Sequence, residues 1–359
     1  MVDSKQAPLD SAAAAKAAFA SVQDKPFPDD IFTAPELRWA VIGCGVIANQ
    51  MAQSLALAGR KLAGVANRTL SKAQAFAEQY GIEKVYESVE DLYADPGIDA
   101  VYITTPHNTH ITYLRDALAA GKHVLCEKAI TLNSAELDEA RAIADEHNVV
   151  LMDATTVLHM PLYQELRRRM DAGEFGRMNL AQLNFGSYKE YGDLTNRFYN
   201  RNLAGGAMLD IGVYALSVMR LFMASQPIEV VSLGNTCETG VDVAGGIVCR
   251  NAEQQLGVVS LTLHSKQPKR SIISFDKCYI EVNEYPRADH ATIVWTADGH
   301  REEIHAGTEA YALCYEMADL EKAVAGDDSK RELLGYASDV MELMTKLRAD
   351  WGVVYPEEE

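Results

Sequence analysis

Short apolar runs alternate with amphipathic stretches along the first 155 residues. Runs such as 39–42 and 100–104 are apolar throughout, as in the buried strands of a parallel sheet, whereas the stretches between them carry apolar residues at a helical period. Strands that alternate with helices in this way predict an α/β domain with a doubly wound parallel sheet. The expected strands are 39–42, 62–66, 100–104, 123–127 and 149–154, and the expected helices are 47–57, 110–120, 134–147 and two that open at Ser71, with a capping-box spacing to Gln74, and at Ser88.

The pattern changes after Ala154. Pro161 opens a helical stretch that ends near Ala172, and from Met178 onward apolar and polar residues alternate as in strands with one buried face. This half predicts an α+β domain with a large, mostly antiparallel open sheet. The expected strands are 180–185, 229–233, 246–250, 256–264, 271–282 and 292–296, and the closing helices are 309–324 and 331–351.

These patterns divide the chain into a first domain at 36–155 and a second domain, for substrate binding and oligomerisation, at 156–359. A broad sheet that helices cover on one face leaves another apolar face, and such a surface usually marks a subunit contact. We therefore expect a homodimer or a homotetramer.

The first 35 residues stand apart as an arm and a linker. Leu9 to Gln23 is rich in alanine and predicts one helix, and Pro26, Pro28 and Pro35 separate it from the first strand. We expect a solvated, partly frayed extension rather than an arm that lies on a partner subunit.

Length and charge bound the class of protein. A chain of 359 residues with 48% hydrophobic side chains is long enough to fill two cores. Its 33 basic and 51 acidic residues leave a net charge of −18, which repels the phosphates of nucleic acids and of anionic membranes. We therefore expect neither as a partner, and any phosphate ligand must be held by local donors.

Cysteine usage and hydropathy favour the cytoplasm. The six cysteines are scattered without a Cys-x-x-Cys pair, as in a protein with reduced core thiols. We expect no apolar run long enough to cross a membrane, and the first 35 residues show no basic and apolar leader.

The most specific motif is Gly43-Cys-Gly45-Val46-Ile47-Ala48, which follows the first strand and opens the first helix. In this G-x-G-x-x-A pattern Gly43 permits a tight turn, Gly45 lets a pyrophosphate approach the backbone, and Ala48 lets the helix pack closely on the strand. Phosphates would then bind the free N–H groups around Val46 and Ile47, at the positive end of the helix dipole. The motif predicts a Rossmann domain that binds a dinucleotide.

The residues after the second strand indicate which dinucleotide. Enzymes that use NAD usually carry an acid here to hold the ribose 2′-hydroxyl, whereas this chain has Asn67-Arg68. An uncharged Asn67 removes the repulsion that a 2′-phosphate would meet, and Arg68 supplies a guanidinium that can bind it. We expect NADP. The alternative is that Arg68 is a solvated surface charge and that NAD is used as well.

Two further segments, 105–108 and 127–129, follow strands at the edge of the sheet where such folds bind their ligands. A lysine at this edge, Lys128, can reach both a nicotinamide ribose and a reacting hydroxyl. His107 and His110 have a spacing that suggests a metal, but no cysteine or carboxylate joins them locally, so we expect no metal and assign them to helix capping and cofactor contact. The expected cofactor contacts in these segments are Thr105, Pro106, His107, Asn108, His110, Glu127 and Lys128.

One helix of the second half carries polar groups on an otherwise apolar surface. Gly205-Gly206 precede a stretch, 207–223, in which Asp210 and Tyr214 share one face four residues apart. A buried carboxylate is costly unless it is satisfied. Either Asp210 bonds a backbone amide while Tyr214 packs, or Tyr214 exchanges a proton beside the nicotinamide while Asp210 positions the reacting group.

The glycine loop, Glu127-Lys128 and the segment from Gly205 to Tyr214 resemble the glucose-fructose oxidoreductase and inositol dehydrogenase family, from about Glu36 onward. Tyr214 in place of histidine, and the Thr-Pro-His sequence at 105–107, are similar to the branch of dimeric dihydrodiol dehydrogenases and NADP-linked xylose dehydrogenases. Ala129 and Ala207 depart from the family's proline and third glycine. Neither change removes a titrating group, so activity is still expected.

The resemblance implies a catalytic group of Lys128, Asp210 and Tyr214, with Arg197 and Asn200 beside the substrate. It implies an NAD(P)-dependent dehydrogenase, with NADP preferred, that oxidises C1 of an aldose sugar or a hydroxyl of a cyclic diol. In this group a nearby lysine ammonium is expected to lower the tyrosine pKa towards neutrality. A trans-dihydrodiol dehydrogenase and a catalytically silent NADP-binding regulator are the alternatives.

Overall fold

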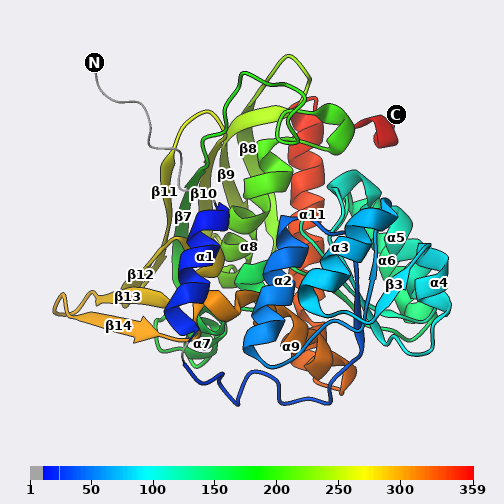
Figure 1. The fold of residues 1–359 in the computed structure, drawn as a ribbon. Helices are drawn as coiled ribbons and strands as arrows, with labels where there is room; N and C mark the ends of the chain where they lie inside the picture. Colours follow the sequence, from blue (N-terminus) through cyan, green and yellow to red (C-terminus); the bar gives the residue numbers. More distant parts are fainter. Residues whose placement is uncertain (1–10, 24) are drawn as a thin grey trace, which may run out of the picture.

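The computed structural model describes residues 11–23 and 25–359, and the strands within them form two sheets. All pairings in the first sheet are parallel, and its order β3-β2-β1-β4-β5-β6 is that of a Rossmann fold (Figure 1). This confirms the predicted doubly wound sheet. Its strands are β1 (Trp39–Ile42), β2 (Gly64–Ala66), β3 (Lys84–Tyr86), β4 (Ala100–Ile103), β5 (His123–Cys126) and β6 (Leu151–Asp153).

The helices between these strands follow the sequence pattern, with one error at a helix start. Ser88 caps its helix by accepting a hydrogen bond from Asp91 N at 3.1 Å, as its spacing predicts. Ser71 does not cap, because the helix begins one residue earlier and Thr69 is the N-cap residue. The helices are α2 (Val46–Leu57), α3 (Leu70–Tyr80), α4 (Val89–Ala94), α5 (His110–Ala119) and α6 (Ser134–Glu146).

A helix from late in the sequence completes the core of the first sheet. α9 (Ala312–Val324) packs beside α2, and its apolar residues share a cluster with Trp39 and Val41 of β1. Glu321 on α9 accepts a hydrogen bond from Trp39 Nε1 at 3.0 Å and pairs with Arg60 at 2.6 Å. The division of the chain into domains at residue 155 stays a prediction. The core beside the first sheet contains residues from both sides of that division.

The second sheet has the order β14-β13-β12-β11-β7-β10-β9-β8 and is antiparallel except where β10 pairs with β7. The predicted strand 271–282 is two strands, because Asp276 turns the chain by bonding back to Arg177. The sequence pattern did not predict β14. The strands are β7 (Met178–Gly186), β8 (Pro227–Thr236), β9 (Asp242–Asn251), β10 (Leu256–Thr262), β11 (Gln267–Phe275), β12 (Cys278–Asn283), β13 (His290–Trp295) and β14 (Arg301–His305).

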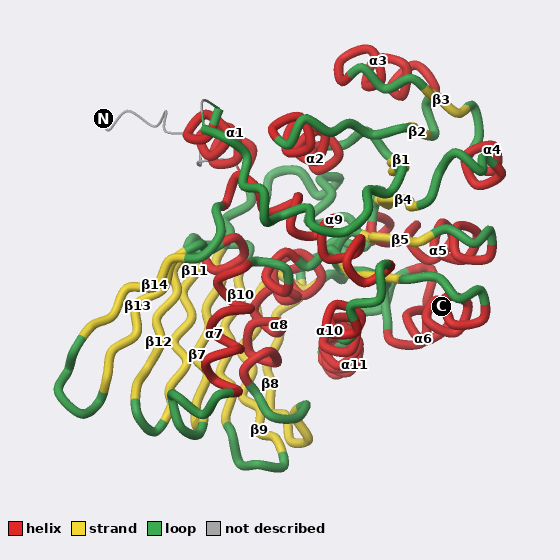
Figure 2. The backbone as a smooth tube through the Cα atoms, turned by 90° about the horizontal axis from the view of Figure 1, so that it is seen from below, coloured by secondary structure: helices red, strands yellow, loops and turns green. Residues whose placement is uncertain are grey.

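The two faces of the second sheet differ. α7 (Pro161–Asp171) and α8 (Val213–Phe222) lie on the same side of it (Figure 2), and α8 packs on β7 and β10. On the opposite face the side chains of Val231 and Leu233 are 75% and 84% exposed. The register places Val248, Leu256 and Tyr279 on that same face. We call these five residues the open sheet face.

The arm packs on its own chain in this structure, and its contact with a partner subunit stays a prediction. α1 (Ser11–Val22) lies against α2 and against the turn 309–311, and Val22 and Ile31 are buried. Phe27 contacts the ring of Tyr311 edge to face, with centroids 5.0 Å apart. The predicted helix is confirmed from Ser11 onward, and Leu9 and Asp10 lie outside the described residues.

The expectation that no apolar run is long enough to cross a membrane is corrected by one helical segment. Among the described residues, the helical stretch Arg201–Phe222 is long and apolar enough to cross a membrane. However, 83% of its most apolar window is buried inside the protein. It serves here as a core helix, packed between the second sheet and α11 (Leu333–Asp350).

α11 runs between the two domains, with α8 on one side and α6 on the other (Figure 1). It follows a short helix, α10 (Asp328–Arg331). Directly after α11, the indole of Trp351 lies against β8 and β9, where a Cβ on Gly234 or Gly245 would come within 2.2 or 2.3 Å of its ring. Trp351 Nε1 donates to Ser232 Oγ at 3.0 Å. We call this contact the tryptophan slot.

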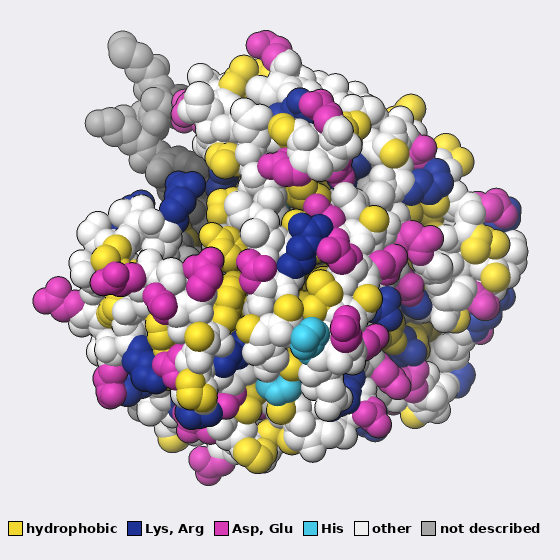
Figure 3. Space-filling view, turned by 90° about the vertical axis from the view of Figure 1, so that its right-hand side faces the viewer, with side chains coloured by type: hydrophobic (Ala, Val, Ile, Leu, Met, Phe, Trp, Pro, Cys, Tyr) yellow, Lys and Arg dark blue, Asp and Glu magenta, His cyan; other side chains and the backbone are white. Residues whose placement is uncertain are grey.

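Acidic side chains are spread over the face of the molecule in Figure 3, with lysines and arginines between them. The net charge of −18 is therefore not concentrated at one place on this face. A phosphate is therefore expected to bind only where nearby hydrogen-bond donors or cations hold it, as the composition implied.

Candidate active site

The glycine loop forms an open cradle at the start of α2. Gly43 has a φ of +103°, and a Cβ there would lie 2.6 Å from Thr104 Oγ1, so this position requires glycine. A Cβ on Gly45 would meet nothing within 4 Å, and the side chain of Val46 is 64% exposed. The first N–H groups of a helix, here those of Val46 and Ile47, have no partner inside it. This cradle fits the pyrophosphate of a dinucleotide.

The end of β2 lies beside this cradle, because Gly43 N donates to Ala66 O at 2.9 Å. Asn67 follows, and its Nδ2 donates to Thr69 O at 3.0 Å. Arg68 is exposed and makes no ion pair within the described part of the chain. The position that carries an acid in NAD-selective enzymes is therefore uncharged here, with a free guanidinium next to it.

The two histidines of the next loop have different roles. His110 is buried, and its ring nitrogens lie 2.8 Å from Thr105 O and 3.0 Å from Ala129 O. It therefore ties two loops together, and its predicted cofactor contact stays a prediction. His107 is half-buried, with Nδ1 3.4 Å from Ala204 O. Burial and then the Lys128 ammonium lower the pKa of His107 to about 3, so its ring is neutral.

The remaining loop residues mostly bind other parts of the chain. Thr105 Oγ1 accepts a hydrogen bond from Thr109 Oγ1 at 2.8 Å, and Pro106 is exposed. Asn108 Nδ2 donates to Asn202 O at 3.2 Å and to Glu357 Oε1 at 2.7 Å. Asn108 Oδ1 is buried without a partner among the described residues. The predicted cofactor role of Asn108 stays a prediction, and its amide nitrogen bridges the two domains.

Lys128 is the centre of the site. It follows β5, and its Nζ donates to Asp210 O at 2.6 Å and lies 3.4 Å from Asp210 Oδ1. It also lies 4.8 Å from the centre of the Tyr214 ring. The Lys128 and Asp210 side chains are only 12% and 13% exposed. The structure thus brings the three residues of the implied catalytic group together from both domains.

The local helix geometry supports this arrangement. Residues Met208–Gly212 form a π-type turn before α8, and Asp210 and Tyr214 project from the same side of it. Burial opposes the charge of Asp210, but Lys128 and Arg197 outweigh it and lower the pKa of Asp210 to about 2. Burial also opposes the charge of Lys128, yet Tyr214 and Asp210 keep its pKa raised. Both groups are charged at neutral pH.

Tyr214 departs from the expectation for its acidity. Burial raises the pKa of Tyr214, and the nearby Lys128 ammonium lowers it by less, so the pKa lies above its ordinary value. The lysine acts in the expected direction but does not dominate. Tyr214 therefore holds its proton at neutral pH in this structure.

Sequence reasoning missed a buried acidic cluster below Lys128. Tyr102 of β4 donates a short hydrogen bond to Glu127, and burial raises the pKa of Glu127 and of Glu316. Glu316 accepts a hydrogen bond from Thr156 Oγ1 at 2.7 Å. Tyr102 lies in an apolar run that is typical of core strands, so nothing in the pattern marked it. The hydrogen bond from Tyr102 fixes the Glu127 carboxylate in place, and the predicted cofactor contact of Glu127 stays a prediction.

The two residues expected beside the substrate differ in their contacts. Arg197 Nη2 lies 3.6 Å from Asp210 Oδ1, and its guanidinium sits over the Phe198 ring, so it borders the catalytic group. Asn200 instead caps a short turn by accepting a hydrogen bond from Asn202 N at 2.9 Å. It shapes the loop, and a direct substrate contact for it stays a prediction.

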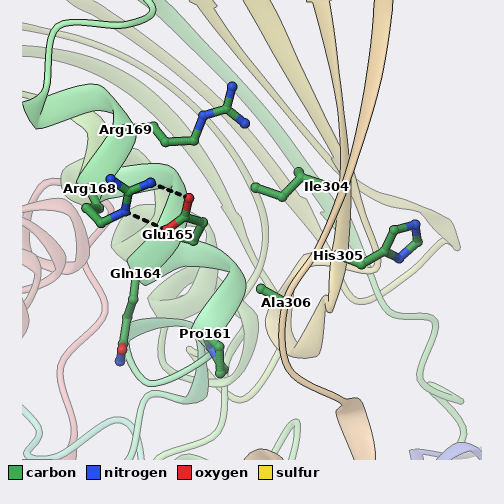
Figure 4. Close-up of a pocket in the computed structure, with 8 residues that line it drawn as sticks. All are labelled: Pro161, Gln164, Glu165, Arg168, Arg169, Ile304, His305 and Ala306. Carbon is green, nitrogen blue, oxygen red and sulfur yellow. Dashed lines mark hydrogen bonds and ion pairs between the residues drawn. The ribbon is translucent and has the colours of Figure 1, made fainter.

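A pocket of about 660 Å³ lies elsewhere, between α7 and β14 (Figure 4). Its cations are already paired: Arg168 binds Glu165 at 2.7 Å, and Arg169 binds Glu302 at 2.8 Å. The pocket is remote from the glycine loop and from Lys128, neither of which lines it. We therefore place the candidate active site at Lys128 and not at this pocket.

Comparison with known proteins agrees with this geometry. Residues 37–155 match the GFO/IDH/MocA family of oxidoreductases with an NAD-binding Rossmann fold. Residues 163–281 match the GFO/IDH/MocA C-terminal domain. A trans-1,2-dihydrobenzene-1,2-diol dehydrogenase from Mus musculus is 32% identical over 254 residues, which are 69% of this chain and 75% of that protein. The chain belongs to the GFO/IDH/MocA oxidoreductase family.

Three further proteins match most of the chain. The Sus scrofa protein of the same name is 28% identical over 341 residues, 90% of this chain and 99% of that one. A 3-ketoreductase from Actinomadura kijaniata, solved with NADP and TDP-benzene, has a TM-score of 0.74 at 24% identity and covers 88% of this chain and 98% of its own. A levoglucosan dehydrogenase solved with NADH and levoglucosan has a TM-score of 0.75 at 18% identity, with 87% and 97% covered. These two show the shared fold.

Membership in the GFO/IDH/MocA family fixes the general activity. The chain is an NAD(P)-dependent dehydrogenase that acts on CH–OH groups. The recognition of the family from the glycine loop and the segment around Asp210 is thereby confirmed.

Proposed function

We propose that this chain is an NADP-preferring dehydrogenase for a hydroxyl of a cyclic diol or a sugar, with Lys128, Asp210 and Tyr214 as its catalytic group. The observation that carries the proposal is the Lys128 ammonium, held between Asp210 and the Tyr214 ring at the carboxyl edge of the first sheet. A fixed positive charge at this place can bind the reacting hydroxyl and the ribose of the cofactor together.

The proposed chemistry moves one hydride and one proton. When bound, NADP would supply the acceptor for the hydride that leaves the carbon carrying the hydroxyl. Tyr214 exchanges the hydroxyl proton, and Lys128 stabilises the negative charge that develops on either oxygen. Asp210 holds Lys128 in place, and Arg197 closes the substrate side of the group.

The raised pKa of Tyr214 bears on how the rates of reduction and oxidation should depend on pH. A tyrosine that keeps its proton at neutral pH is ready to donate it to a carbonyl, so reduction needs no prior ionisation. Oxidation needs the phenolate and becomes faster as the pH rises towards the raised pKa. This replaces the sequence-based expectation of a tyrosine that is a base near neutrality.

The preference for NADP rests on Asn67 and Arg68. Asn67 places no negative charge at the ribose end of the cradle, and Arg68 is free to bind a 2′-phosphate. NAD is the alternative cofactor, because Arg68 is exposed and can swing away from the site.

The relatives guide the choice of substrate. The names of those with 28% to 32% identity indicate oxidation of a trans-1,2-dihydrodiol, which favours a cyclic diol over C1 of an aldose as the first substrate to test. A panel of trans-1,2-dihydrobenzene-1,2-diol, aldoses and inositols, followed by the absorbance of reduced cofactor, separates the two. Turnover of the aldoses alone would reject the diol.

The same panel separates an enzyme from a silent regulator. A regulator would bind NADP, as seen by quenching of protein fluorescence, and turn over none of the compounds. The retention of both Lys128 and Tyr214 in contact supports the enzyme.

We also propose a homodimer or homotetramer that forms through the open sheet face, whose apolar side chains lie uncovered in one chain. A cytoplasmic location is supported by the six free thiols of the described chain, since thiols stay reduced there.

A further inference from the structure

The segment 355–359, which follows the tryptophan slot, contacts three loops that lie next to His107, Lys128 and Asp210 in the chain. Tyr355 is buried, and its hydroxyl donates to Gly205 O at 2.7 Å. Glu357 accepts a hydrogen bond from Asn108 at 2.7 Å, and Glu358 accepts one from Asn133 at 3.0 Å. In Figure 1 this segment lies beside the loops at the carboxyl edge of the first sheet.

Glu358 is the most constrained residue of this segment. Its carboxylate pairs with both terminal nitrogens of Arg348, at 2.8 and 2.9 Å, and Arg348 is 1% exposed. Burial opposes the charge of Glu358, but Arg348 outweighs it and lowers the Glu358 pKa. Arg348 also donates to Leu132 O, so one buried ion pair joins α11 to the loop after Lys128.

The three loops carry the chemistry. Asn108 is next to His107, Asn133 closes the loop that starts at Lys128, and Gly205 precedes the turn that presents Asp210. Two of these loops belong to the first domain and one to the second. Direct contacts join them from Asn108 to Asn202, from His107 to Ala204 and from Lys128 to Asp210. A segment that binds all three restrains the distance between Lys128 and Asp210.

We propose that Glu357 and Glu358 are positioning residues, and that the segment 355–359 fixes the two halves of the active site in register. The catalytic consequence rests on the proposed function, because it assumes that Lys128 and Asp210 act as a unit. The mechanical consequence does not, because it follows from the contacts alone. A displacement of about 1 Å at a catalytic group is enough to cost a large part of turnover.

The test compares Glu358→Ala with two controls in the full chain. Glu358→Gln keeps an oxygen that accepts from Asn133, and Glu359→Ala removes only an exposed pair with Arg201. Hydrogen exchange followed by mass spectrometry should show Glu358→Ala exchanging about 10-fold faster at residues 105–110, 128–133 and 204–208, with Glu358→Gln in between. Glu359→Ala should leave exchange at 105–110 and 128–133 unchanged, because its partner Arg201 lies outside these ranges.

The kinetic arm uses trans-1,2-dihydrobenzene-1,2-diol and NADP. Glu358→Ala should lower kcat about 10-fold with KM for the diol within about 3-fold, because the group is misplaced rather than lost. Exchange that stays at the level of the unmodified protein in all three loops of folded Glu358→Ala would overturn the inference, as would an equal effect of Glu359→Ala. If no variant, nor the unmodified protein, oxidises any compound, the proposed function fails, while hydrogen exchange still decides the role of the segment.

Discussion

Tyr214 shows how burial and a neighbouring charge compete at one side chain. The ring lies under the Lys128 ammonium, which favours the phenolate, but the loss of water around the hydroxyl raises the pKa by more. The sequence could identify the pair, because both residues lie in recognisable motifs. It could not weigh the two effects, because the extent of burial depends on Phe185 and other residues far along the chain.

Tyr214→Phe should lower turnover about 100-fold or more in both directions, with nearly unchanged NADP affinity, since the phenol contacts the reacting oxygen and not the phosphates. In the unmodified enzyme the reduction rate should be flat through neutral pH, and the oxidation rate should rise throughout the alkaline range. Steady-state kinetics in both directions against pH checks this. A variant that keeps near-normal turnover and the same profile would show that Tyr214 only packs.

The proposed preference for NADP over NAD depends on the side chains of Asn67 and Arg68. Arg68 should favour NADP over NAD by about 10-fold, the lower end for a charged hydrogen bond because Arg68 is exposed. Asn67→Asp combined with Arg68→Ala should invert the preference. Specificity constants for both cofactors measure it, and equal constants in the unmodified enzyme would contradict the proposal.

Side-chain partners were the least predictable feature at this scale. His110 and Asn200 lie in the loops that the sequence indicated, and both bind neighbouring backbone groups that the sequence did not reveal. An imidazole or an amide can serve either purpose, and the choice depends on which carbonyl or N–H the fold places beside it.

At the scale of elements, the start of the active-site helix depends on a buried acid from β9. Asp242 Oδ2 accepts a hydrogen bond from Met208 N at 2.6 Å, where the π-type turn before α8 begins. Burial raises the pKa of Asp242 from 3.8 to about 6, and the hydrogen bond from Met208 lowers it by less. The folded protein therefore holds this proton more tightly than the unfolded chain does.

A raised carboxyl pKa makes folding less favourable as the pH rises through the interval between the two values. In the unmodified protein the contribution of Asp242 to stability should be fully present below about pH 4 and lost above about pH 6. Asn cannot lose a proton, so Asp242→Asn should gain stability relative to the unmodified protein as the pH is raised from about 4 to about 6. The gain in the free energy of unfolding should be on the order of 3 kcal/mol. Urea unfolding of both proteins at the two pH values checks this, and a constant difference would contradict it.

The strands and helices with strong periodicity were predicted to within a few residues, as for β1, α2 and α6. β3 was not predicted, because three residues that begin with an exposed lysine at a sheet edge give no readable period. β14 was missed for a similar reason, since its outward residues are charged and only alternate ones are partly buried. The break at Asp276 depends on bonds to Arg177 in another strand, which no local pattern reveals.

At the scale of the whole molecule, the open sheet face gathers five exposed apolar side chains of the described chain on one face of the second sheet. Val231→Lys combined with Leu233→Lys should convert the oligomer to a monomer, because two charges would have to be buried in the interface. Light scattering at micromolar concentration measures the mass, and thermal unfolding confirms that the variant is folded. A monomeric unmodified protein would contradict the proposal directly.

Two features of the whole could not be predicted from local patterns. α9 lies more than 150 residues after the sheet that it covers, and the segment 355–359 reaches loops from both domains. Both depend on contacts across the full length of the chain, whereas periodicity reports only on the nearest few residues. The family resemblance supplied the fold and the catalytic group, but no motif marked these long-range contacts.

The tryptophan slot has a consequence for how much length variation the chain can tolerate. Trp351 is fixed between β8 and β9, and Glu358 is fixed by Arg348, so residues 352–357 must span one defined distance. Most surface loops accept an inserted residue at little cost. Here one more residue would add about 3.3 Å of chain, several times the tolerance of a hydrogen bond. The number of residues between Trp351 and Glu358 is therefore fixed by the distance between the two contacts. We expect an insertion in this stretch to be tolerated as poorly as a substitution of Lys128.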